Sequence, residues 1–210
     1  MDKAAVGRSR TRTICLVGLA VALIAVSAWV TIPIGPIPFT LQMFAIPLMI
    51  YVLRPSEVIC AIYAYVFLGG LGLPIFSGMR GGIGVLLGPT GGFLIGYLIG
   101  VPLAALLLHA VRSHMTKRSS QNGSASPEKG ERAKVYAFLR SSGWELLAGI
   151  VFIFFAYLVG TLRYDAVTGV GLPLSFAACA APFIVPDLIK DVLAILTARL
   201  IKSALRERYW

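Results

Sequence analysis

Three ionisable residues lie close together near the end of this 210-residue chain, within a largely apolar run. Asp187, Lys190 and Asp191 interrupt residues 183–200. An ionisable side chain inside a membrane span costs about 2.5 to 3.5 kcal/mol even on lenient insertion scales, so it usually marks a ligand or ion site. A lysine offers a cation to a ligand carboxylate, and an aspartate accepts hydrogen bonds from ligand N–H groups. These three residues are therefore the first candidates for a binding site.

The local sequence PFIVPDLIKD predicts that the three side chains share one helical face. Pro182 and Pro186 interrupt the helix, and Pro186 suits the first position of a new helical segment. On that segment Asp187, Lys190 and Asp191 stand at i, i+3 and i+4. A broken helix also presents unpaired backbone N–H groups, which favour a carboxylate ligand. The alternative is an internal pair of Asp187 with Lys190 that holds helices together, with Asp191 as a second acid that neutralises the lysine.

The composition indicates an integral membrane protein. Hydrophobic residues make up 58% and charged residues 13%, with a mean hydropathy of +0.84, whereas soluble domains carry about 25% charged residues. A net charge of +10 would suit a nucleic-acid partner, but the basic residues flank apolar runs and form no basic face. They predict membrane topology, so we expect lipid around the chain and no nucleic acid.

The apolar runs predict an all-α fold with six transmembrane helices in a single membrane domain, residues 1–210. The second and third runs are short and are joined only by Arg54 and Pro55, so a hydrophobic hairpin or partly re-entrant helices remain as alternatives. The expected spans are residues 13–30, 40–53, 56–71, 91–111, 143–161 and 174–201.

The lysines and arginines predict the orientation, because cytoplasmic segments carry the excess. Most of them fall in the N-terminus (residues 1–12), in the segment of about residues 112–140 and near the C-terminus (residues 202–210). The segments on the other side hold only Arg80 and Arg163. Both termini are therefore expected in the cytoplasm, and the polar segment 112–140 is expected to be a flexible cytoplasmic loop.

The outer segments, residues 31–39, 69–92 and 169–173, are rich in glycine and proline yet largely apolar. Proline removes backbone donors and glycine permits positive φ, so we expect irregular structure there. Apolar irregular segments must bury their side chains, and a cap over a ligand pocket between the helices would do so. Ordinary interfacial loops are the alternative.

Motifs for catalysis, metal binding and nucleotide binding do not occur. The glycine-rich stretch RGGIGVLLGPTGG matches neither the P-loop nor the dinucleotide-binding pattern. The three cysteines have no CxxC spacing, and neither a GxSxG elbow nor an HExxH is present. We therefore expect no metal, no cofactor and no enzymatic activity. One enzymatic alternative remains, an intramembrane enzyme that uses Asp187 and Asp191 as a carboxylate pair.

The first span carries three small residues, Gly18, Ala22 and Ala25, on one helical stripe. Small residues let a second helix approach closely. The stripe predicts either packing within the chain or a docking face for a partner membrane subunit.

Four segments together closely resemble the BioY family, the biotin-specific substrate-binding (S) component of energy-coupling factor (ECF) transporters. They are IPIGPIPFTLQ, YVFLGGLGLPIF, LLGPTGGFLIGY and PFIVPDLIK, in this order. The resemblance covers residues 13–201 apart from the loop 112–140. It implies the six-helix S-component fold and high-affinity uptake of biotin. It also implies two kinds of partner, a transmembrane coupling protein (T component) and two ABC-type ATPases; an S component for another vitamin remains the alternative.

The resemblance also implies which residues bind the ligand. By their D-x-x-K spacing, Asp187 and Lys190 correspond to the family's binding aspartate and lysine. The GPTGG segment corresponds to the family's loop and helix start beside the pocket, which implies that Thr90, Gly91 and Gly92 lie there. Phe93 stands where family members often have tyrosine. On the same grounds the stripe on the first span would contact the coupling protein.

Overall fold

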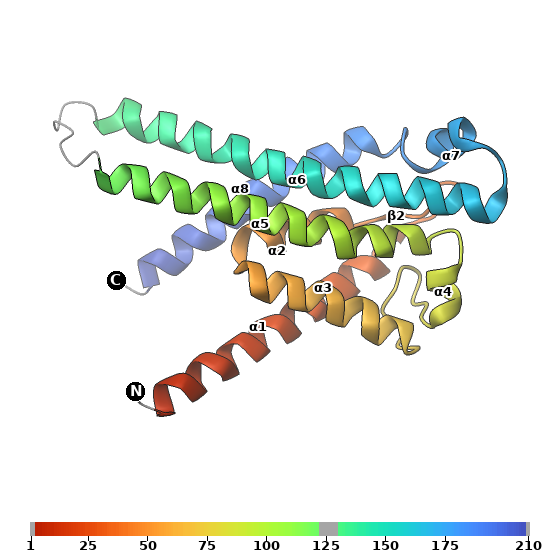
Figure 1. The fold of residues 1–210 in the computed structure, drawn as a ribbon, viewed down its shortest axis with the longest axis horizontal. Helices are drawn as coiled ribbons and strands as arrows, with labels where there is room; N and C mark the ends of the chain where they lie inside the picture. The colour runs from red at the N-terminus through yellow and green to blue at the C-terminus, as the bar shows by residue number, and fades with distance from the viewer. Residues whose placement is uncertain (1–2, 122–129, 209–210) are drawn as a thin grey trace.

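The computed structural model describes the backbone of residues 3–121 and 130–208 (Figure 1). These residues are mostly helical, with one short antiparallel hairpin that pairs β1 (Thr31–Ile32) with β2 (Phe39–Thr40). The helices are α1 (Lys3–Trp29), α2 (Gln42–Val52), α3 (Pro55–Gly70), α4 (Ile83–Leu87), α5 (Gly91–Gln121), α6 (Gly130–Thr168), α7 (Leu172–Cys179) and α8 (Ile184–Arg208).

Each expected span is mostly helical, and the last one is interrupted between Cys179 and Ile184. Among the described residues, Arg10–Trp29, Gly91–His114 and Ser142–Thr168 are each long and apolar enough to cross a membrane. Helices α7 and α8, bent by 45° at their break, make a fourth when they are counted together as one span. The other two, α2 and α3, are apolar helices of 11 and 16 residues. The expected all-α fold with six apolar helical segments therefore agrees with the structure.

The short second and third segments are two separate helices. Leu53 ends α2 with an extended backbone, and Pro55 begins α3, where its fixed φ suits the first helical position. The carboxylate of Glu57 accepts the backbone N–H of Arg54 at 3.0 Å, which satisfies a donor at the helix start. The turn between the two helices is thus encoded locally by proline and a capping glutamate.

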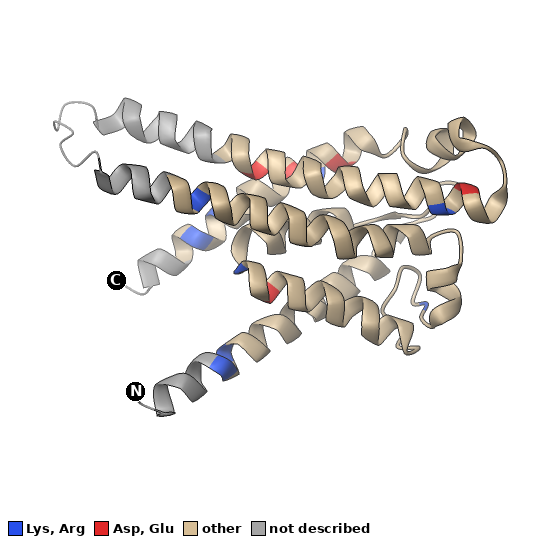
Figure 2. Ribbon diagram, in the orientation of Figure 1, with Lys and Arg blue, Asp and Glu red and all other residues tan. Residues whose placement is uncertain are grey.

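The bundle has two chemically different ends. One end, at the left of Figure 1, holds both termini, the C-terminal end of α5 and the N-terminal end of α6. The other end holds α4 and α7. Figure 2 shows more blue ribbon towards the end with the termini than towards the end with α4 and α7, and it also shows red ribbon in the middle of the bundle. The orientation of the chain in the membrane stays a prediction.

Two expected boundaries were wrong. Segment 112–140 is helical over residues 112–121 and 130–140, since α5 and α6 extend beyond their apolar parts; residues 122–129 lie outside the described residues. Its Ala, Leu, Glu, Lys and Arg residues are strong helix formers, which explains the extension. In the last span, α8 begins at Ile184, so Pro186 is its third residue and not its first. Asp187 still lies in the first turn, as expected.

Glycines explain why α5 and α6 lie side by side along the bundle (Figure 1). Gly92, Gly96 and Gly100 recur every fourth residue of α5 and meet the α6 backbone. A Cβ atom added at Gly96 would lie only 2.8 Å from the Cα of Ala156. This close approach depends on a small-residue stripe that the sequence analysis did not identify.

Replacing Gly96 with leucine should strongly destabilise the bundle. The new side chain would meet backbone, which cannot move aside, so we expect a cost at or above the usual range of about 1–3 kcal/mol for overpacking. The measurement is the thermal unfolding midpoint of the purified protein in detergent. Gly18→Leu is the matched control, because no atom lies within 4 Å of a Cβ at Gly18. Equal midpoints for the two variants would contradict this account of the α5–α6 packing.

Candidate ligand-binding site

A cavity opens between the helices at the end of the bundle that carries α4 and α7. About 640 Å³ of space lies within it, its open mouth and the adjoining solvent included. Two of the three outer segments line it: Ile37 and Pro38 from residues 31–39, and Phe76 and Arg80 from residues 69–92. The third segment, residues 169–173, does not line it. The expected cap over a ligand pocket is thus present and is built from two of the three segments.

Asp187 provides the acidic group on the cavity wall. It is 2% exposed. The hydroxyl of Tyr157 on α6 donates a hydrogen bond to its Oδ2, and Lys190 donates to its Oδ1 at 2.9 Å. Each carboxylate oxygen still has a further lone pair for a ligand donor. The first turn of α8 and the tyrosine from α6 therefore hold an oriented hydrogen-bond acceptor against the cavity.

Lys190 is not one of the residues that line the cavity. Besides its bond to Asp187, its Nζ donates to the backbone oxygen of Thr40 at 2.7 Å and lies 3.3 Å from the ring centroid of Phe39. The ion pair, a carbonyl and an aromatic face together compensate the cation for loss of water. Lys190 thus connects Asp187 to strand β2 through its ion pair and its bond to Thr40. The internal ion pair of the alternative is therefore present, and contact of Lys190 with a ligand carboxylate stays a prediction.

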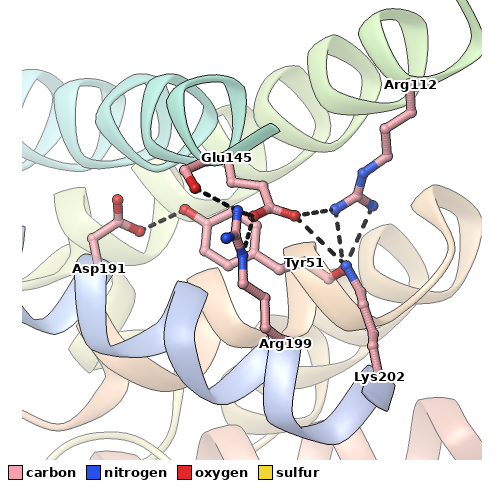
Figure 3. Close-up of polar contacts among 7 residues, drawn as sticks. Tyr51, Arg112, Glu145, Asp191, Arg199 and Lys202 are labelled. Atoms are coloured by element: carbon pink, nitrogen blue, oxygen red, sulfur yellow. Dashed lines mark hydrogen bonds and ion pairs between the residues drawn. The ribbon is translucent and has the colours of Figure 1, made fainter. Parts of the chain in front are cut away.

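Asp191 belongs to a different cluster. It is fully buried, and the hydroxyl of Tyr51 on α2 donates to its Oδ1 at 2.6 Å (Figure 3). Gly149 of α6 packs against the carboxylate so closely that a Cβ would lie 2.2 Å from it. Asp191 does not line the cavity, and Asp187 and Asp191 hold different partners. The arrangement therefore supports neither a shared carboxylate pair for an enzyme nor a role for Asp191 in neutralising Lys190.

The GPTGG segment divides into one lining residue and two packing residues. Thr90 lines the cavity, whereas Gly91 and Gly92 do not. A Cβ at Gly91 would lie 1.9 Å from the carbonyl oxygen of Leu86, and one at Gly92 would lie 2.3 Å from Cβ of Arg163. These two glycines allow the start of α5 to approach α4 and α6, which places Thr90 at the cavity.

Several cavity residues were missed by the sequence analysis. Tyr97 and Tyr157 lie within apolar helical runs, where nothing in the sequence marks a tyrosine hydroxyl as facing a cavity. Gln42, which is 3% exposed and donates to the hydroxyl of Tyr65 at 2.9 Å, is a polar residue opening an apolar helix and was a signal that could have been used. Arg80 lines the cavity from the glycine-rich segment, and its Nε donates to the carbonyl of Ser77 at 3.1 Å.

The small-residue stripe of α1 is only partly available to a partner. Gly18 and Ala22 are exposed, and the space beside Gly18 is open. Ala25 is 5% exposed and belongs to the packed core of the bundle. Ala25 therefore packs within the chain, and Gly18 and Ala22 are the two positions of the stripe that stay exposed for the predicted docking.

Comparisons with known proteins agree with this architecture. A sequence model of the BioY family matches residues 1–207. The biotin transporter BioY of Thermotoga maritima is 34% identical over 197 residues, which cover 94% of this chain and 99% of that protein. The probable biotin transporter BioY of Pyrococcus horikoshii is 33% identical, with 90% and 95% covered.

A solved structure shares the fold. It is the crystal structure of the S-component for biotin from an ECF-type ABC transporter, with a TM-score of 0.74 at 23% identity, covering 97% of this chain and 95% of the other. The sequence relationship and the shared fold extend over nearly the whole chain. This chain belongs to the BioY family.

Proposed function

We propose that this chain is the biotin-binding S component of an ECF-type transporter. One observation carries the proposal: a buried carboxylate, Asp187, is held by Tyr157 and Lys190 on the wall of a small-molecule cavity. Biotin carries two ureido N–H groups, and an oriented carboxylate is a strong acceptor for them. The relatives of this chain are named as biotin transporters, which agrees with that chemistry.

The rest of the cavity suits the rest of the ligand. Apolar walls such as Met43, Phe93 and Phe183 would contact the ring carbons and the aliphatic chain of biotin. The carboxylate of biotin, at the opposite end from the ureido group, would then face Arg80 on the outer loops. We place Arg80 opposite this carboxylate because Arg80 lines the cavity, while Lys190 would act on the ligand through its ion pair with Asp187.

Isothermal titration of the purified chain tests the proposal. Biotin should bind, whereas thiamine and riboflavin, which lack the cyclic urea and the acidic chain in this arrangement, should not. Biotin methyl ester should bind more weakly than biotin, since it cannot form an ion pair with Arg80. Tight binding of either other vitamin without binding of biotin would assign the chain to a different ligand.

The chain is a multi-pass membrane protein, and we propose a single membrane domain with residues 1–12 and 202–210 in the cytoplasm. Arg80, Arg163 and the cavity would then face the outside, where biotin is captured. The partners would be a transmembrane coupling protein and two ABC-type ATPases. Loaded with biotin, the component would tip in the membrane when the ATPases act, and so deliver the vitamin to the cytoplasm.

The exposed part of the α1 stripe is the proposed contact with the coupling protein. Gly18→Leu should leave biotin binding unchanged, since α1 at this position contacts no cavity residue. It should reduce recovery of the coupling protein in co-purification by about tenfold, the factor that corresponds to about 1.4 kcal/mol of lost packing. Cys60→Leu, which also places a leucine at an exposed position but on α3, serves as the control. Unchanged recovery with Gly18→Leu would remove this docking face.

A further inference from the structure

The four buried tyrosines of the described residues differ in what their hydroxyl groups contact. Three of them donate to a carboxylate or carbonyl oxygen: Tyr51 to Asp191, Tyr65 to Ile75 and Tyr157 to Asp187. The hydroxyl of Tyr97, a residue that is 5% exposed, donates instead to the thioether sulfur of Met43, at 3.8 Å. A thioether is a weak acceptor. Among these four tyrosines, Tyr97 is therefore the one whose donor has no strong acceptor.

The weakly paired hydroxyl of Tyr97 belongs to a residue that lines the ligand cavity. A buried donor without a good acceptor destabilises a folded protein, and most such groups in native structures have a partner. Tyr51 and Tyr65, which have oxygen partners within the chain, do not line the cavity. The hydroxyl of Tyr97 thus lies where a bound molecule can supply the acceptor that the protein does not.

Packing between α5 and α6 fixes the position of this hydroxyl relative to Asp187. The ring centroid of Tyr97 lies 5.5 Å from that of Phe152 on α6. One turn earlier on α5, Phe93 packs edge-on against the ring of Tyr157, the residue that holds Asp187. The hydroxyl of Tyr97 is close enough to Asp187 for an electrostatic interaction between them. The side-by-side pair of helices therefore presents one donor and one acceptor to the same cavity (Figure 1).

Three other donors on the cavity wall already contact an oxygen. They are Nε2 of Gln42, which donates to the hydroxyl of Tyr65, Nε of Arg80, which donates to the carbonyl of Ser77, and the hydroxyl of Ser77, which pairs with that of Thr31 at 3.2 Å. The remaining N–H groups of Arg80 are those that we place opposite the ligand carboxylate. Tyr97 is therefore the donor that fits a second acceptor on the ligand.

We propose that the hydroxyl of Tyr97 donates a hydrogen bond to the ureido oxygen of biotin, while Asp187 accepts one from a neighbouring ureido N–H. This inference rests on the proposed function and adds a residue that determines specificity. An ionised carboxylate can only accept, and the tyrosine hydroxyl supplies the donor. A cyclic urea presents N–H and C=O groups on neighbouring atoms, so it satisfies both side chains. A ring that lacks either group would leave a buried polar side chain unpaired, and the site would reject it.

Tyr97→Phe tests this role, because it removes the hydroxyl and keeps the ring that packs against Phe152. Isothermal titration should show biotin binding weakened about tenfold, the factor that corresponds to about 1.4 kcal/mol. The thermal unfolding midpoint without biotin should stay at the parent value, since the hydroxyl gives up only a thioether partner. Tyr51→Phe is the matched control, because Tyr51 is also buried but does not line the cavity. It should lower the midpoint, since Asp191 loses its donor, and keep the biotin affinity.

Two biotin analogues identify the ligand atom that Tyr97 contacts. In 2-thiobiotin a sulfur, which is a weaker acceptor, replaces the ureido oxygen. The parent chain should therefore bind it more weakly than biotin, and Tyr97→Phe should reduce its binding much less than that of biotin. Biotin methyl ester keeps the urea and lacks the free carboxylate, so Tyr97→Phe should reduce its binding by the same factor as for biotin.

The outcomes separate this assignment from the proposed function. If the parent chain binds biotin, then an unchanged affinity of Tyr97→Phe, an equal loss with Tyr51→Phe, equal losses for biotin and 2-thiobiotin, or a smaller loss for the methyl ester would each overturn the role of Tyr97 alone. Binding of 2-thiobiotin to the parent chain as tightly as biotin would overturn it without any variant. A parent chain that bound no biotin would overturn the proposed function and this assignment together.

Discussion

Asp187→Asn is expected to weaken biotin binding by at least about 100-fold. The carboxylate is the acceptor that we place opposite the ureido N–H groups, and hydrogen bonds to charged groups contribute about 1.5–3 kcal/mol each. Asparagine keeps the shape of the side chain but replaces one acceptor oxygen with a donor. A ligand N–H would then face an N–H₂ group in a buried site, and both would lose their partners. Isothermal titration with biotin measures the effect.

The chain offers a closely matched control for this variant. Asp191 is one helical turn further along α8, is equally buried and also accepts a hydrogen bond from a tyrosine, but it does not line the cavity. Asp191→Asn should therefore keep the biotin affinity of the parent chain. If Asp191→Asn weakened binding as much as Asp187→Asn, the acceptor role of Asp187 would be lost and a general effect on the bundle would explain both.

Lys190→Met is expected to weaken biotin binding and to lower the thermal unfolding midpoint. The lysine neutralises Asp187 and also contacts the carbonyl of Thr40 and the ring of Phe39. Removing one partner of a buried ion pair costs about 3–5 kcal/mol, because the other charge is left without compensation. The aspartate would lose its fixed orientation and hairpin β1–β2 its attachment to α8. Thermal unfolding with and without biotin separates the two effects.

The double variant Asp187→Asn with Lys190→Met distinguishes these contributions. With neither charge present, no buried ion remains uncompensated, so the unfolding midpoint should rise above that of Lys190→Met alone. Biotin binding should remain lost, since the acceptor is absent. A double variant that is as unstable as Lys190→Met would show that the contacts to Thr40 and Phe39, and not the pair with Asp187, account for the stability of this region.

The sequence predicted the region of the candidate site but not which side chains line the cavity. Asp187 was identified because an acid within an apolar span is rare, whatever its neighbours are. Tyr157 was missed because placing a tyrosine in an apolar span costs far less free energy than placing a charged side chain there, so its presence is not unusual. Arg80 was left unassigned because it lies in an irregular glycine-rich segment, and only the folded loop shows that it reaches the cavity.

The helix boundaries also could be predicted only in part. The length of the apolar runs predicted where the spans lie. It did not predict that α5 continues to Gln121 or that α6 already begins at Gly130. A polar helix outside the membrane follows from helix propensity and not from hydropathy. The stripe of Gly92, Gly96 and Gly100 was likewise visible in the sequence, but its meaning depends on α6 as the neighbour.

Hydropathy and the cost of buried charge are local properties of the chain, so they were sufficient to predict a membrane protein with six apolar helical segments and with ionisable residues in its last span. Which of these ionisable residues lines the cavity depends on the neighbouring helices, and this could be seen only in the fold. Asp187 and Asp191 lie one turn apart on the same face of α8, and their partners on other helices give them different roles. Tyr157 holds Asp187 at the cavity, whereas Tyr51 and Gly149 enclose Asp191 within the bundle.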